Sequence, residues 1–271
     1  MRRAEQGAAR LSQPSIRLEI NAPFGEIILN KPDKRNALSV DMWAAIPELI
    51  EQVEAAETVK VVIIHGGDAG AFAAGADISE FSTIYATRET AAQSGGVIAA
   101  ALNAVEACTK PVIAAIDGAC VGGGMSLAMA ADLRVAGEGA RFGITPAKLG
   151  IVYPAGDTRR LVTAIGASRA KDILFTARIF ETAEAKEMGL LNRVVGEGEA
   201  LAGARDLGAL VASTSQWSTR AIKRMVTGIE AGWTDMSAEA SALFLDGFGS
   251  EDFIEGYSSF LAKRPANFTF K

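Results

Sequence analysis

The chain has 271 residues, 49% hydrophobic and 22% charged, a balance typical of a globular domain with a sizeable core. A formal net charge of −5 without a strongly basic segment argues against a nucleic-acid partner, and no apolar run reaches the ~20 residues that a membrane span needs. Two cysteines, Cys108 and Cys120, are too few for a disulfide framework or a zinc site and favour a reducing, cytoplasmic location.

The predicted elements begin after residues 1–14, an extension that lacks the apolar core of a secretory signal and that we expect to be disordered. Apolar runs then alternate with helical patterns, which predicts an α/β core of right-handed parallel units over residues 15–200. In chain order, the predicted strands are 16–20, 26–29, 59–65, 112–116, 132–136, 141–144 and 191–195. The predicted helices among them are 40–56, 91–107, 125–131, 158–166, 168–177 and 183–188.

The remainder of the chain is mainly helical in pattern. Helices are predicted at 199–213, 217–229, 237–248 and 250–262. We find no internal repeat and no low-complexity linker. Residues 201–271 are therefore predicted to form a C-terminal helical region that packs on the α/β core.

Three successive glycines, Gly122 to Gly124, join a predicted strand to a helix of small residues. Three glycines in a row cost backbone entropy, which indicates that the chain must approach something closely there. The free N–H groups and the dipole at a helix N-terminus also favour negative charge. The stretch therefore fits either a site for a developing anion or a tight packing turn, whereas its GACVGGG spacing does not fit the GxGxxG dinucleotide motif.

The chain resembles the enoyl-CoA hydratase/isomerase (crotonase) superfamily in five segments: NKPDKRNAL (30–38), AFAAGADISEF (71–81), KPVIAAIDGACVGGGMSLAMAADLRVA (110–136), RFGITPAKLGIVYPAGDTRRL (141–161) and FLAKRPANF (260–268). This resemblance implies an α/β fold in which stacked ββα units form a spiral core, with a C-terminal helical region for trimerisation. It also implies acyl-CoA substrates, with coenzyme A as part of the substrate and no prosthetic group or metal. Self-association as a homotrimer or a dimer of trimers would follow.

The reactions of this superfamily place negative charge on the thioester oxygen as an enolate, which two backbone N–H groups can stabilise in the transition state. By resemblance, the donors here are Ala76 and Gly123. The same resemblance predicts coenzyme A contacts from three parts of the chain. They are Lys34 or Arg35 with Ala37 along the nucleotide, Ala74, Asp77 and Ile78 at the adenine and pantetheine, and Phe260 and Lys263 from the tail, within one subunit or across a subunit contact.

Two positions depart from the hydratases of this superfamily, which use two glutamates to position water and transfer a proton. The aligned residues here are Ser126 and Pro146, and neither has a carboxylate. A serine hydroxyl needs a partner to act as a base near neutral pH, and the sequence shows none. The only histidine, His65, is interpreted as a strand-end residue with a satisfied hydrogen bond, and Asp157 as a helix cap. We therefore expect water addition to be inefficient.

Three hypotheses follow for the activity. The first is enolate chemistry on an acyl-CoA by a hydratase or isomerase of this superfamily. The second is a malonyl-type decarboxylase, because ITPAKLGIVY (144–153) resembles the methylmalonyl-CoA decarboxylase branch, in which residues matching Thr145 and Tyr153 approach the substrate carboxylate. That branch has glutamate at the position of Ser126 and histidine at that of Ala76, so the match is partial. The third is a non-catalytic acyl-CoA-binding protein.

Overall fold

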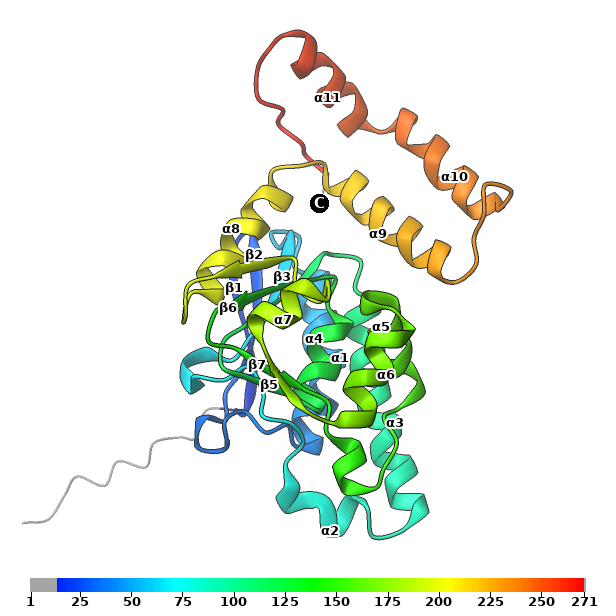
Figure 1. The fold of residues 1–271 in the computed structure, drawn as a ribbon. Helices are drawn as coiled ribbons and strands as arrows, with labels where there is room; N and C mark the ends of the chain where they lie inside the picture. The colour runs from blue at the N-terminus through cyan, green and yellow to red at the C-terminus, as the bar shows by residue number, and fades with distance from the viewer. Residues whose placement is uncertain (1–13, 271) are drawn as a thin grey trace, which may run out of the picture.

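A computed structural model describes residues 14–270 of the chain and shows a mixed α/β core with a helical arm above it (Figure 1). The main sheet has six strands in the order β1-β2-β3-β4-β6-β9, and only the β1–β2 pair is antiparallel. Their bounds are β1 (Ile16–Asn21), β2 (Phe24–Leu29), β3 (Val61–His65), β4 (Val112–Ile116), β6 (Leu133–Gly137) and β9 (Arg193–Val195). A smaller sheet joins β5 (Ala119–Val121), β7 (Arg141–Gly143) and β8 (Ile179–Glu181).

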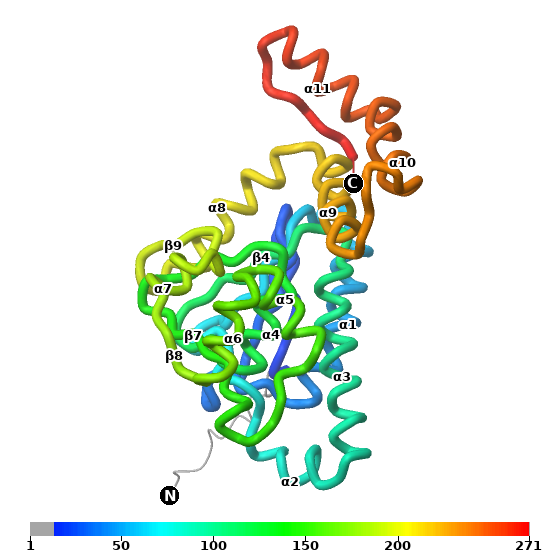
Figure 2. The backbone as a smooth tube through the Cα atoms, turned by 45° about the vertical axis from the view of Figure 1, so that its right-hand side comes forward, coloured from blue at the N-terminus to red at the C-terminus, as the bar shows by residue number. Residues whose placement is uncertain are grey.

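The main sheet is covered by helices on both faces. On β3, Val62 and Ile64 belong to the large core shared with α1 (Val40–Ala55), α3 (Arg88–Ala107) and α4 (Gly123–Ala130). The alternate residues Val61 and Ile63 pack on the opposite face with α8 (Ala200–Ala212). Figure 2 shows α8 on the far side of the strands from the α1–α3 pair. Burial on both faces explains why this strand reads as a continuous apolar run.

Smaller helices complete the core, and three more form the arm. The core helices are α2 (Phe81–Ile84), α5 (Ala155–Ile165), α6 (Ala167–Thr176) and α7 (Thr182–Glu187). The arm consists of α9 (Gln216–Glu230), α10 (Ala238–Asp246) and α11 (Glu251–Leu261), which stand away from the sheet in both views (Figures 1 and 2). An ion pair fastens the arm to the core, because the ammonium of Lys223 on α9 lies 2.7 Å from the carboxylate of Asp132.

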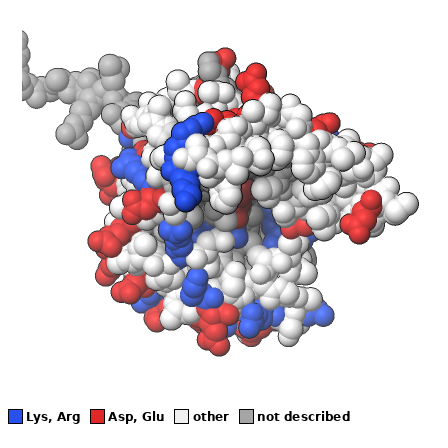
Figure 3. Space-filling model, turned by 90° about the horizontal axis from the view of Figure 1, so that it is seen from above, with Lys and Arg blue, Asp and Glu red and all other residues white. Residues whose placement is uncertain are grey.

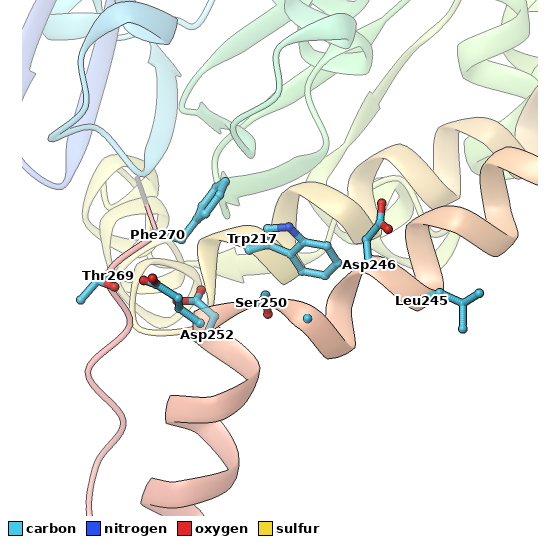
Figure 4. Close-up of a pocket in the computed structure, with 9 residues that line it drawn as sticks. Trp217, Leu245, Asp246, Ser250, Asp252, Thr269 and Phe270 are labelled. Atoms are coloured by element: carbon cyan, nitrogen blue, oxygen red, sulfur yellow. The ribbon is translucent and has the colours of Figure 1, made fainter.

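The arm has an unusually apolar surface for the outside of a single chain. Many of its large side chains are exposed, including Phe244, Phe248, Phe260, Ile254 and Met236. Figure 3 views the molecule from the side of these helices and shows a broad area with few charged groups. A groove of about 620 Å³ runs between α9, α11 and the C-terminal tail, lined by aromatic rings such as Trp217 and Phe270 (Figure 4).

Most predicted elements lie where the sequence placed them, with shifts of a few residues at their ends. The helix predicted at 91–107 begins earlier, at Arg88, because Thr87 and Thr90 form a reciprocal capping box. The helix predicted at 158–166 begins at Ala155, directly after Pro154. The prediction for the N-terminal extension lies outside the described residues, apart from Pro14. Across residues 14–270, no helix is both long and apolar enough to cross a membrane.

Candidate active site

Two loops bring the backbone of Ala76 close to that of Gly123. The neighbours of Ala76 are bonded to Leu38, whose N–H donates to Gly75 O (2.8 Å) and whose O accepts from Asp77 N (2.9 Å). Gly123 is the first residue of α4, and a Cβ atom on it would lie 3.8 Å from Ala76 N. Within residues 14–270, neither Ala76 N nor Gly123 N donates a hydrogen bond, and both residues are partly exposed. The pair is therefore available to an anion from outside.

Two of the glycines around this pair occupy positions that a side chain would not fit. Gly122 and Gly75 have φ angles of +52° and +118°, which side chains rarely adopt. Gly124 packs so closely that a Cβ atom on it would lie 2.4 Å from Ala73 O. The turn and the close packing thus belong to Gly122 and Gly124, which leaves Gly123 with a free N–H at the positive end of a helix.

Several predicted coenzyme A contacts gather beside this pair. Asp77 caps a short turn through Ser79 N (3.1 Å) and binds the ammonium groups of Lys31 (2.7 Å) and Lys34 (2.8 Å). The lysines hold the pKa of Asp77 well below its usual range. Ala74 N donates to Arg35 O (3.0 Å), and this bond joins the loop before Ala76 to the loop that carries Lys34 and Arg35.

Of the remaining predicted coenzyme A contacts, two lie near this pair of amides and two do not. Ala37 leads into Leu38 at the same junction, and the side chain of Ile78 is 74% exposed beside it. In contrast, Phe260 lies in the last turn of α11 and Lys263 follows that helix, and α11 stands well away from α4 in both views (Figures 1 and 2). A single chain does not bring these two residues to the site. Their predicted role stays tied to a contact between subunits.

Three buried side-chain oxygens form a hydrogen-bonded row that begins at Ser126, one helical turn after Gly123. Ser126 Oγ lies 2.8 Å from Tyr153 Oη and donates to Asp157 Oδ2, also over 2.8 Å. All three residues are at least nine-tenths buried. Because the serine has one hydroxyl hydrogen and gives it to Asp157, the tyrosine donates to the serine. The expectation that Ser126 lacks a partner is therefore wrong.

Asp157 connects these three hydrogen-bonded side chains to a buried network of charged groups. Its Oδ1 atom accepts from Arg160 Nη1 (3.1 Å), and the same guanidinium binds Glu106 on α3 through Nε and Nη2. Burial raises the pKa of Asp157 above its usual range, although Ser126 and Arg160 oppose the shift. Burial, together with the charge of Asp157, also raises the pKa of Tyr153. The site thus contains a desolvated carboxyl group whose protonation is sensitive to its neighbours.

The interpretation of Asp157 as a helix cap is also wrong. Pro154 holds the N-cap position of α5, and Asp157 is its third residue, with the carboxylate directed to Ser126 on α4. A separation of 31 residues between these partners gives no sequence signal. The spacing of Asp157 and Arg160 along one helical face was a detectable signal of a paired carboxylate.

Two other sequence-based candidates lie outside this network. Thr145 precedes a short 3-10 helix (Pro146–Leu149), and within residues 14–270 its side chain forms no hydrogen bond with Tyr153 or Ser126. His65 Nδ1 accepts from Gly67 N (3.2 Å), as expected of a strand-end histidine. Its Nε2, however, has no hydrogen-bond partner among the described residues and lies 3.6 Å from Glu26 Oε2, so that expectation is only half correct.

Comparison with known proteins assigns the chain to a family. The sequence profile described as Enoyl-CoA hydratase/isomerase matches residues 19–271. The chain belongs to this family. A crotonyl-CoA hydratase of Syntrophomonas wolfei is 35% identical over 266 residues, which are 96% of this chain and all of that protein. A short-chain-enoyl-CoA hydratase of Clostridium acetobutylicum is 31% identical and aligns with 92% of this chain and 95% of its own.

Solved structures agree with this assignment. A member of the enoyl-CoA hydratase/isomerase family from Hyphomonas neptunium has a TM-score of 0.94 and 64% identity, over 95% of this chain and 98% of its own. An enoyl-CoA hydratase/carnithine racemase from Magnetospirillum magneticum has a TM-score of 0.91 and 33% identity, with 96% and 97% covered. The crotonase-like fold and the expected lyase or isomerase family of acyl-CoA enzymes are therefore confirmed.

Proposed function

We propose that this chain binds the thioester oxygen of an acyl-CoA between the N–H groups of Ala76 and Gly123 and stabilises an enolate there. The observation that carries the proposal is the pair of neighbouring, partly exposed amides that donate to nothing within residues 14–270. A backbone N–H without an acceptor in its own chain bonds to a group from outside, and two such donors side by side can share one oxygen atom. Aligned donors of this kind stabilise charge that develops in the transition state.

The coenzyme A part of the substrate would then follow the loops that carry Lys34, Arg35, Ala37, Ala74, Asp77 and Ile78. Lys34 and Arg35 are exposed enough to meet phosphates. Asp77 supports the proposal in a different way, because it fixes the loop next to Ala76 and holds the two lysine ammonium groups beside it. Its own role is to position the donor loop.

Proton transfer at the carbon next to the thioester is the reaction class that the site supports best. Hydration and isomerisation of an enoyl-CoA both involve an enolate and a proton. The buried carboxyl group of Asp157 is hydrogen-bonded to Ser126, which lies one helical turn after Gly123. The decarboxylase hypothesis lacks a specific observation in its favour, since Thr145 and Tyr153 do not converge through a shared hydrogen bond among the described residues.

We also propose that copies of the chain associate through the arm formed by α9, α10 and α11. The exposed aromatic and aliphatic side chains of this arm exceed what a monomer usually leaves in water. A second copy is the favoured occupant, because the resemblance implies a homotrimer or a dimer of trimers and would bring Phe260 and Lys263 of one copy near another. Native mass spectrometry at micromolar concentration should show a trimer or hexamer, and a monomer would refute this proposal.

Acetoacetyl-CoA offers a direct test of the enolate proposal, because its 1,3-dicarbonyl unit forms an enolate with a strong ultraviolet absorbance. We expect the protein to bind it and to raise the enolate absorbance at a pH where the free compound is mostly neutral. Acetoacetate without coenzyme A is the control and should give no change. Absence of binding, or binding with no gain in enolate absorbance, would overturn the proposal.

A further inference from the structure

We infer that Asp157 is the proton acceptor and donor of this site and that it exchanges its proton with the substrate through the hydroxyl groups of Ser126 and Tyr153. The inference rests on the proposed enolate chemistry and names the group that handles the proton. It assigns to α5 a carboxylate that replaces the one missing at position 126 on α4.

The geometry provides a continuous path. Asp157 Oδ2, Ser126 Oγ and Tyr153 Oη are joined by two hydrogen bonds of 2.8 Å, a length at which a proton moves between neighbouring oxygens without rearrangement of the side chains. Ser126 lies three residues after Gly123 and therefore on the same face of α4. Its Oγ also lies 3.4 Å from Gly122 O, in the turn that aims the Gly123 amide. The Ser126 hydroxyl of this path therefore lies one helical turn from the Gly123 amide that would hold the enolate oxygen.

The proton transfer balances in atoms and charge. The C–H bond next to the thioester breaks, and its electron pair becomes the enolate, whose oxygen is held by the two amides. The proton goes to Tyr153 Oη while the tyrosine proton moves to Ser126 Oγ and the serine proton to Asp157 Oδ2. Asp157 becomes neutral, and the negative charge it loses appears on the enolate oxygen. Return of the proton to the same carbon or to another carbon of the conjugated system restores the carboxylate.

The surrounding charges suit a carboxyl group that changes its protonation state. Arg160 contacts Oδ1 and leaves Oδ2 to the serine, so the ion pair persists while a proton arrives at the other oxygen. Arg160 is itself neutralised by Glu106, which limits how strongly it holds Asp157 in the charged form. Burial raises the pKa of Asp157 toward the range in which a carboxylate is an effective base.

A purely structural network predicts a different outcome from a proton path, and exchange of substrate hydrogen for deuterium separates the two. The purified full-length protein is incubated with butyryl-CoA in D2O, and deuterium at the carbon next to the thioester is measured by mass spectrometry. This exchange requires a base and an enolate but neither water addition nor a leaving group. We expect wild type to exchange, and D157N to exchange at least about 100-fold more slowly. The dissociation constant for butyryl-CoA should stay within 3-fold.

Three further variants make the test specific. Ser126→Ala keeps the pair between Asp157 and Arg160 but cuts the path, and Tyr153→Phe removes its outer hydroxyl; both should lose exchange to a similar extent. Glu184→Gln is the matched control, because Glu184 on α7 is another carboxylate that binds a guanidinium, that of Arg178, outside this network. Its exchange should stay within 3-fold of wild type. Should D157N fail to fold, the serine variant carries the test.

Each outcome has one meaning. Exchange by D157N or S126A within 3-fold of wild type would overturn the proton path. Loss of butyryl-CoA binding together with exchange in these variants would assign the network a structural role and would also overturn it. Wild type that binds butyryl-CoA without exchange would refute the path while thioester binding stands. Wild type that does not bind would refute the proposed function itself.

Discussion

Replacement of Gly123 by proline tests the oxyanion site with a change of one hydrogen-bond donor. Proline has no backbone N–H, and its fixed φ suits the first position of a helix, which Gly123 occupies. Gly123→Ala is the matched control, because it keeps the N–H but adds the same Cβ atom. That atom would lie 3.2 Å from Trp43 Cζ2 and 3.5 Å from Leu38 Cδ1 in both variants. The comparison of the two variants therefore isolates the amide.

The expected magnitude follows from the chemistry of such donors. Loss of one donor to a developing oxyanion lowers kcat by about 100- to 1,000-fold, or about 2.7–4 kcal/mol. We expect G123A to lose activity less than about 10-fold, since Trp43 must move only a few tenths of an ångström. G123P should be lower than G123A by about 100- to 1,000-fold. A much larger loss would indicate that the proline ring blocks the oxygen.

The assay is the same deuterium exchange into butyryl-CoA, combined with the enolate absorbance of acetoacetyl-CoA. Both signals depend on the oxyanion site, whereas only the exchange depends on a base. Circular dichroism should show similar thermal unfolding for the two variants. Equal exchange rates in G123P and G123A would refute the assignment of Gly123 as a donor, since the amide would then contribute nothing to the enolate.

Three other predictions concern stability and reactivity. Arg205→Ala should lower the free energy of unfolding, measured in urea, by about 2 kcal/mol, because it leaves the buried carboxylate of Glu26 without its bidentate partner. Since the arginine is half-exposed, the loss should be smaller than for a fully buried ion pair. The pKa of Asp77 is lower in the folded state than its unfolded value of about 3.9, so the ionised carboxylate stabilises the fold at any pH above about 4. In urea titrations, the difference in unfolding free energy between wild type and D77N should therefore be constant near neutral pH and should shrink as the pH falls below about 4. Burial raises the pKa of Cys108 to about 12 and that of Cys120 also, so a thiol reagent at pH 8 should modify neither in the native protein and both in urea.

The sequence predicted the elements of the core well where the signal is local. The run from Val61 to Ile64 is apolar throughout because alternate residues face two different helical layers, and a continuous run is the pattern of such a strand. The tight turn at Gly122 to Gly124 was also predictable, since three glycines before a helix suit a backbone that side chains would block, whereas Gly123 as a donor came from the family resemblance and stays a prediction. These features depend on residues that are close together in the chain.

Features that depend on distant residues were missed or misassigned. Ser39 has the N-cap position of α1, which serine commonly caps, but its side chain makes no cap bond, and the N–H of Val40 donates instead to the carboxylate of Glu80 (2.9 Å). Asp157 was likewise interpreted as a helix cap from its local sequence, because only the packing of α5 on α4 brings it to Ser126. A side chain's preference for a cap is a local tendency that a partner from another element can override.

Moving the carboxylate from Asp157 on α5 to position 126 on α4 tests whether the two positions share one space. The family resemblance aligns Ser126 with a glutamate of the hydratases, and in this chain Asp157 contacts that position. Ser126→Glu alone would bury two carboxylates side by side, and repulsion between like charges should destabilise the fold. Removal of the second carboxylate in S126E/D157S should relieve the repulsion.

The double-mutant cycle measures this relation directly. Two residues in contact commonly show a coupling of about 0.5–3 kcal/mol, and we expect S126E and D157S to be coupled favourably by an amount in that range in urea unfolding. Restored deuterium exchange in the double variant, with S126A/D157S inactive as its control, would show that either helix can supply the proton acceptor to one oxyanion site. Additive losses of stability, with no exchange in the double variant, would contradict this, because the two positions would then not share one space. The Gly123 donor would stay at the start of α4 and the Ala76 donor on its own loop, while the base could come from either helix; this arrangement would allow the proposed enolate chemistry without the usual glutamates.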